Sequence, residues 1–83
     1  MKNTSTISAR KLAIFSSNVA RHRKAAGVSK TEFAAHTSVS RDTIRRIETR
    51  PEGYVPSLST IEALAKMVNV TPYEIVSKRI QFV

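Results

Sequence analysis

Residues 29–48, S-K-T-E-F-A-A-H-T-S-V-S-R-D-T-I-R-R-I-E, predict two short helices joined by a tight turn. Ser29 and Glu32 have the spacing of a capping box, in which each side chain satisfies a free backbone N–H at a helix start. The first helix is therefore expected to begin at Lys30. It should end near Thr37, because hydroxyl side chains in that region compete for backbone hydrogen bonds and favour turns.

A second helix is expected over residues 41–49, because Ser40 is a favourable N-cap. At 3.6 residues per turn, one side of this helix holds Ile44 and Ile47, with Glu48 beside them. The opposite side carries charged and hydroxyl side chains, namely Asp42, Arg45, Arg46 and Thr49. Such side chains can bond to base edges in a DNA major groove, which admits one α-helix. The pattern is typical of a DNA-reading helix.

Charge is distributed unevenly along the chain. The 83 residues carry 14 Lys and Arg against 6 Asp and Glu, a net charge of +8, and residues 1–30 hold seven bases and no acid. Residues 51–83 balance at three against three. A one-sided basic field favours a polyanion, either nucleic acid or an anionic lipid surface, although the same charge can simply aid solubility.

Size and composition exclude several other classes of protein. The chain is long enough for one domain with a small core, and it has no cysteine, which excludes disulfide and zinc-finger scaffolds and suits the cytoplasm. Its longest apolar run, residues 12–15, is far too short for a membrane span or signal peptide. Two histidines without patterned carboxylates predict no metal site. No cofactor and no enzymatic activity are expected, because glycine-rich phosphate loops and nucleophile motifs are absent.

Three further helices are expected from apolar spacing and capping residues. One covers residues 9–26, one begins after Ser57 or Ser59 and ends at Asn69, and one follows Thr71. The apolar residues at core spacing are Leu12, Phe15, Val19 and Ala26 in the first of these helices, Leu58, Ile61, Leu64, Ala65 and Val68 in the second, and Ile75 and Val76 in the third.

The two-helix segment resembles the helix-turn-helix of the lambda-repressor/Cro-like family. That family has a small residue in its second helix, a hydrophobic residue in the turn and V-S-R-x-T-I-x-R-I-E in its third helix. Ala34, Val39 and the run V-S-R-D-T-I-R-R-I-E match these features, and the likeness extends from about Phe15 to Val76. It implies an all-α, compact five-helix bundle, a lambda-repressor-like DNA-binding domain.

The chain departs from this family at two positions. Ser38 stands where the family's turn usually has glycine, so a positive φ would strain the serine. Arg50 also stands at a common glycine position, and a longer loop leads from it to Pro56. In this loop Arg50 and Tyr54 could meet the DNA phosphate backbone, although Tyr54 could equally fold back onto the core.

The resemblance also implies which residues contact DNA. Arg41, Asp42 and Arg46 match the family's usual base readers, since arginine can bind guanine O6 and N7 and aspartate can accept from cytosine N4. Asp42 could instead be a cap-region acid that orients Arg41 or Arg46. The residues expected to hold phosphates are Lys30, Ser40, Thr43, Arg45 and Arg50.

Arg23 lies close to the apolar stripe of its helix, where an isolated charge is too costly to keep. Glu48 lies on the core side of the reading helix, and the resemblance pairs an arginine with a glutamate at these positions. We therefore expect an Arg23–Glu48 ion pair that holds the first helix to the base of the reading helix. The alternative is that Arg23 extends to solvent or to a DNA phosphate.

These observations predict a flexible arm over residues 1–8, a helix-turn-helix domain over 9–77 and a tail over 78–83 that contacts a second subunit or frays. One short reading helix specifies few base pairs, so we expect a homodimer on a palindromic operator, with half-sites about 34 Å apart. The expected function is a small repressor of the phage or mobile-element type, which binds double-stranded DNA in the cytoplasm and avoids membranes. The alternative is an antitoxin that binds a small protein partner and regulates its own promoter.

Overall fold

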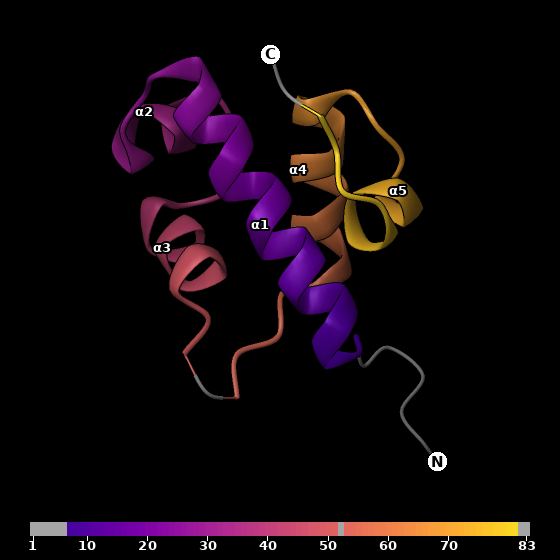
Figure 1. The fold of residues 1–83 in the computed structure, drawn as a ribbon. Coiled ribbons are helices and arrows are strands. Elements are labelled where there is room, and N and C mark those ends of the chain that lie inside the picture. The colour runs from indigo at the N-terminus through magenta and orange to yellow at the C-terminus, as the bar shows by residue number, and fades with distance from the viewer. Residues whose placement is uncertain (1–6, 52, 82–83) are drawn as a thin grey trace.

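The computed structural model describes residues 7–51 and 53–81. Residues 1–6 of the expected arm and residues 82–83 of the tail lie outside this range. Within the described residues the chain forms five α-helices and no strand (Figure 1), which confirms the expected all-α fold class. The helices are α1 (Ala9–Ala26), α2 (Lys30–Ala35), α3 (Arg41–Thr49), α4 (Leu58–Val68) and α5 (Pro72–Ser77).

Helix α1 crosses the middle of the bundle and joins its two halves (Figure 1). It packs against α3 on one side and against α5 on another. Helix α2 packs on α3, and α4 packs on α5. The α2–α3 pair is therefore held by α1, while the C-terminal half supports α1 from a different side.

Each helix starts at a hydroxyl side chain that accepts a hydrogen bond from the backbone N–H three residues later. The five N-caps are Ser8, Ser29, Ser40, Ser57 and Thr71. Capping boxes, in which a glutamate also accepts from the N-cap N–H, are complete at Ser29–Glu32 and Thr71–Glu74. Ser57 rather than Ser59 caps α4. The starting points of these helices are therefore set by local side-chain chemistry.

The turn between α2 and α3 is tied by Thr37. Helix α2 ends at Ala35, two residues before the expected limit. The Thr37 hydroxyl accepts from the Val39 N–H at 2.8 Å, so this side chain serves the turn rather than the helix. Among described non-glycine residues, positive φ angles occur at Arg50 and Asn69, so the strain considered for Ser38 does not arise.

The core draws large, fully buried side chains from all five helices: Phe15, Asn18, Val19, Phe33, Ile44, Ile47, Leu64 and Ile75. Two residues expected in the core are instead exposed. Leu58 is 66% exposed, and Ala26 also lies on the surface. Leu58 is the first residue of α4 and Ala26 the last of α1, so both extend beyond the part of each helix that neighbours cover.

A buried amide, Asn18, binds the end of the chain to α1. Its side-chain nitrogen donates to the carbonyls of Ile75 and Lys78, at 2.9 and 2.8 Å, and its oxygen accepts from the Ile80 N–H at 2.9 Å. Arg21 donates to the Ile80 carbonyl at 2.6 Å. The described part of the tail is therefore bound to α1 of its own chain, a role for Asn18 that the sequence pattern did not indicate.

None of the helices in residues 7–51 and 53–81 combines the length and hydropathy needed to cross a membrane. The same residues contain no group of three or more His, Cys, Asp or Glu side chains that could hold a metal ion.

We expect the stability of the fold to decrease in mild acid because of His22. Its ring lies against Phe33, with 5.8 Å between ring centroids, and burial lowers its pKa. The imidazole of His22 therefore binds a proton more readily in the unfolded chain than in the folded protein. Stability from His22 is therefore full above about pH 6.5 and is lost as the pH falls towards the lower folded-state pKa.

Urea unfolding followed by far-UV circular dichroism between pH 7.5 and 5.5 measures this loss. His22→Gln should reduce the dependence on pH, because it removes the ring that titrates. An equal dependence in wild type and His22→Gln would contradict the assignment to His22.

Candidate nucleic-acid interface

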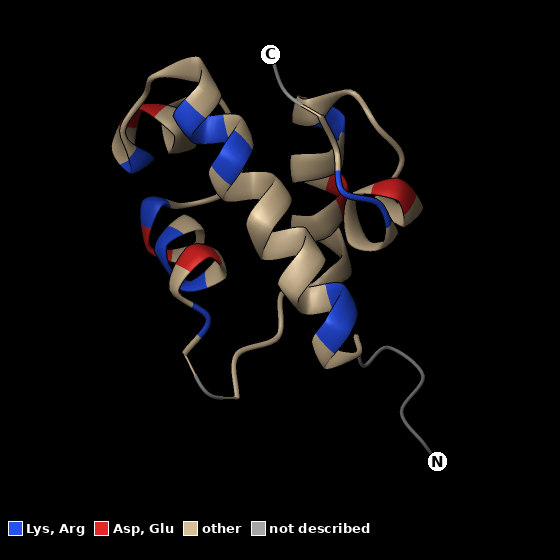
Figure 2. Ribbon diagram, viewed as in Figure 1, with Lys and Arg blue, Asp and Glu red and all other residues tan. Residues whose placement is uncertain are grey.

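Helix α3 presents two chemically different sides. Ile44 and Ile47 are fully buried, and they seat the helix in the core. The opposite side carries exposed side chains of both charge signs. Figure 2 marks the basic and acidic residues along the helix. The exposed residues of α3 are Arg41, Asp42, Arg45, Arg46 and Thr49. The side chains of Asp42, Arg45 and Arg46 are about half exposed, so these residues remain accessible from solvent.

A bidentate ion pair fixes α3 to α1. Arg23 Nε lies 2.7 Å from Glu48 Oε2, and Arg23 Nη2 lies 2.9 Å from Glu48 Oε1. The two side chains are 13% and 8% exposed. Arg23 also donates to the Val28 carbonyl at 2.9 Å, which adds the loop before α2 to the same contact. The hydrogen bonds that Arg23 donates to Glu48 raise the pKa of Arg23, which keeps the guanidinium charged.

Lys30, which is expected to bind a phosphate, lies next to the Arg23–Glu48 pair. Its Nζ is 3.9 Å from Glu48 Oε1, and its side chain is about one third exposed. The glutamate therefore interacts with a buried arginine and a surface lysine together. This second contact was not predicted, because residues 30 and 48 meet only when α2 and α3 pack.

Asp42 forms ion pairs with two arginines of its own helix. Its Oδ1 lies 2.8 Å from Arg45 Nη2, and its Oδ2 lies 3.1 Å from Arg46 Nε. The hydrogen bond from Arg45 and the charges of Arg46, Arg45 and Arg41 lower the pKa of Asp42. The carboxylate is therefore ionised and shared between the two arginines. From the sequence the expected partner of Asp42 was Arg41 or Arg46; Arg46 is one partner, and Arg45, at i,i+3 spacing, is the nearer one.

Two hydroxyl groups stand at the start of α3. Ser40 Oγ accepts from the Thr43 N–H at 3.2 Å and donates to Thr43 Oγ1 at 3.0 Å. Ser40 is exposed, and Thr43 is half-buried. Both expected phosphate-binding hydroxyls therefore lie together at the helix N-terminus, where the helix dipole favours an anion.

At the other end of α3, Arg50 occupies the left-handed conformation that glycine usually adopts. It has φ of 50° and ψ of 60°, and its N–H donates to the Arg46 carbonyl at 2.8 Å. An L-residue in this region carries a cost of about 1–2 kcal/mol. Its side chain is exposed beyond the helix end. The common family glycine is thus replaced by a strained but charged residue.

A hollow of about 430 Å³ opens beside α3, lined by Arg45, Arg46, Pro51, Gly53 and Tyr54. Tyr54 packs partly against the core, and this burial raises the pKa of its hydroxyl. It also lines the hollow next to the arginines. The two interpretations of Tyr54 are therefore compatible, since one ring can pack inward and still border the surface.

A family model described as a helix-turn-helix domain matches residues 15–75, which include the whole of α2 and α3. The chain belongs to the helix-turn-helix family. Neither the curated proteins nor the solved structures contain a match. Membership identifies this helix-turn-helix protein as a DNA-binding regulator of a kind that is typically not enzymatic. The match ends one residue before the limit of the sequence resemblance at Val76.

We expect the Arg23–Glu48 pair to be the main polar contact that positions the recognition helix of this helix-turn-helix domain. Glu48→Gln should lower the free energy of unfolding by about 3–5 kcal/mol, because it leaves a nearly buried guanidinium without its counter-charge. Lys30→Met, a matched control at the exposed contact, should cost under about 1 kcal/mol.

Urea unfolding of the wild type, Glu48→Gln, Arg23→Met and the double variant completes a double-mutant cycle. If the loss in unfolding free energy of the double variant equals the sum of the losses of Glu48→Gln and Arg23→Met, the two residues are not coupled. That result would contradict this role.

Proposed function

We propose that this helix-turn-helix protein is a small dimeric repressor that reads a palindromic operator through the major groove with α3. The observation that carries the proposal is the exposed side of α3, where three arginines and an aspartate stand on a helix that the core and the Arg23–Glu48 pair hold in place. A helix held in one orientation can direct its side chains to particular base edges. A helix that moves freely could make only non-specific contacts to phosphates.

In this proposal Arg41 and Arg46 bind base edges, and guanine is the base that a forked guanidinium fits best. Asp42 accepts from cytosine N4 or aligns Arg46, and its ion pair with Arg46 supports the second role. The phosphate contacts come from Lys30, Ser40, Thr43, Arg45 and Arg50. Three of these five residues carry a positive charge, so affinity should depend strongly on salt.

A homodimer on the operator is supported by exposed apolar side chains near the end of the α3–α4 loop. Val55 is 47% exposed and Leu58 is 66% exposed, and both stand close in sequence to Tyr54 beside α3. A contact of this size is too small to hold two chains together in solution. On a palindrome the DNA itself keeps two copies at high effective concentration, so a small apolar contact can suffice.

A second candidate function, an antitoxin-type regulator with a protein partner, is favoured by one observation. Helix α1 has an apolar groove on its outer side, away from its contact with α3. A protein partner bound there would leave the proposed DNA surface free.

Binding-site selection from random duplexes tests the main proposal. Wild type should select two inverted half-sites whose centres are about one helical turn, near 34 Å, apart. Arg46→Ala should lose about 1–3 kcal/mol of discrimination at one base pair of each half-site, because a bidentate contact is removed. Arg79→Ala, which removes the same charge from the tail, should select the wild-type site.

The selection has two adverse outcomes. Selected sites without inverted symmetry would overturn the dimer, and uniform weakening by Arg46→Ala, with unchanged base preference, would make Arg46 a phosphate contact.

We expect Asp42 to restrain non-specific DNA binding. Asp42→Asn removes the charge that neutralises Arg45 and Arg46, so affinity for random duplex should rise and the plot of log affinity against log salt should steepen by about 1. Preference for the selected operator should decrease, because Arg46 loses the carboxylate that aligns its side chain. Fluorescence anisotropy with operator and scrambled duplexes measures both effects. A variant with weaker random-duplex binding would contradict this role.

A further inference from the structure

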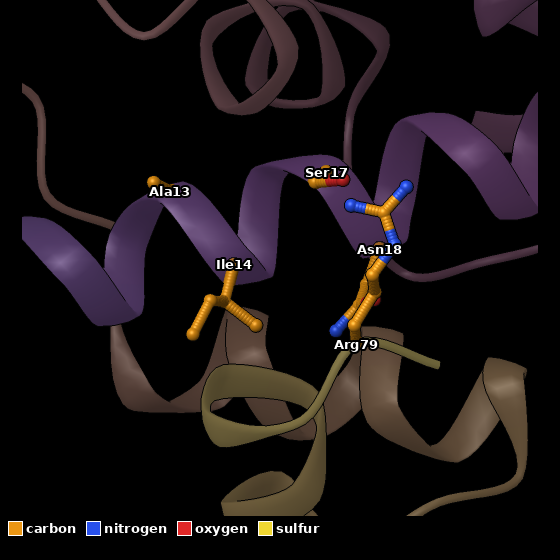
Figure 3. A pocket seen from close by; sticks show the side chains of 5 residues that line it. All are labelled: Ala13, Ile14, Ser17, Asn18 and Arg79. Atoms are coloured by element: carbon orange, nitrogen blue, oxygen red, sulfur yellow. The ribbon is translucent and has the colours of Figure 1, made fainter. Parts of the chain in front are cut away.

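The outer side of α1 contains a groove of about 250 Å³ that the DNA-binding proposal does not use. It is lined by Ala13, Ile14, Ser17 and Asn18 from α1 and by Arg79 from the tail (Figure 3). Ala13 and Ile14 are only partly covered, in contrast to the fully buried Phe15 beside them. The surface is thus apolar along one turn of the helix and ends at a guanidinium.

Positive charge surrounds this apolar surface. Arg10 lies one turn before Ala13 and Arg21 one turn after Ser17, on the same side of the helix. Helix α1 contains no acidic residue. Within residues 7–51 and 53–81, neither Arg10 nor Arg79 forms an ion pair with a carboxylate. Burial lowers the pKa of Arg21, and the positive charge of Arg79 lowers it further.

The groove and the recognition helix lie on different sides of α1. Arg23 faces α3 through Glu48, whereas Asn18 faces the tail and α5. In Figure 1 residues 78–81 and α3 lie on opposite sides of α1. A ligand in the groove would therefore not cover the exposed side of α3.

The chemistry of the groove discriminates between possible occupants. The phosphates of a DNA duplex could pair with the arginines, but DNA has no flexible apolar group that could cover Ala13 and Ile14. A second copy of this chain would bring a further net charge of +8 to a basic surface, which disfavours that encounter. An acidic amphipathic peptide supplies both an apolar side chain for the groove and carboxylates for its edge.

We propose that the α1 groove binds an acidic amphipathic segment of a protein partner, with an apolar side chain against Ala13 and Ile14 and a carboxylate paired with Arg79. This proposal rests on the second candidate function. It can be wrong while the DNA-binding proposal remains valid, because different residues bind the peptide and the operator. The protein would then carry its partner while bound to DNA.

Selection from a phage-displayed library of random 16-residue peptides against the full chain tests this proposal, followed by anisotropy with the enriched peptides in synthetic form. Enriched sequences should be acidic, with apolar residues three or four positions apart. Arg79→Glu should weaken their binding at least about tenfold, because attraction becomes repulsion. Ala13→Glu, which fills the groove at a helix-compatible position, should weaken it as well.

Two controls separate this site from others. Lys66→Glu, a charge reversal on α4 outside the groove, should leave peptide affinity unchanged, and Arg46→Ala should reduce operator binding without affecting the peptide. Circular dichroism of each variant establishes that it is folded. Enriched peptides that lack acidic residues, or that bind wild type, Arg79→Glu and Ala13→Glu equally, would overturn the proposal. So would a loss of operator affinity in Arg79→Glu as large as that in Arg46→Ala, since the groove would then be a DNA contact.

Discussion

The bidentate contact between Arg23 and Glu48 is the constraint on which the position of α3 depends. A helix of nine residues is not stable alone in water, so α3 must take its stability and its direction from its neighbours. Ile44 and Ile47 determine how deeply it is seated. The planar guanidinium and carboxylate then restrict its rotation, because two parallel hydrogen bonds form in one orientation only. These contacts therefore determine the directions in which the side chains on the exposed side of α3 point.

The exposed side of α3 carries the cations that the DNA-binding proposal requires, together with an anion that pairs with two of them. A purely basic surface would bind any phosphate backbone, whereas Asp42 neutralises part of the charge and holds Arg45 and Arg46 in defined positions. These pairs are about half exposed, so they add little to folding stability. In the proposed function these pairs act instead on the orientation and availability of the arginines, and through them on selectivity between DNA sites.

Helix α1 organises both surfaces of the molecule. One side holds α3 through Arg23, and another holds the tail through the buried amide of Asn18. A buried amide is tolerable only when its hydrogen bonds are satisfied, and here the backbone of residues 75–80 satisfies them. This contact places Arg79 at the edge of the α1 groove. Asn18, which binds residues 75–80 to α1, therefore also contributes to the α1 groove.

Local chemistry in the sequence determined the helix starts, the two sides of α3 and the caps at Gly27 and Asn69, because these depend on residues within about one helical turn. Periodicity did not reveal that Leu58 and Ala26 lie at uncovered helix ends, since burial depends on what packs against each turn. Only the tertiary structure brought Lys30 to Glu48, Asn18 to the tail and Arg79 to the groove. Lys30 and Glu48 are 18 positions apart in the chain and Asn18 and Ile80 are 62 apart, and such separations close only when the whole bundle folds.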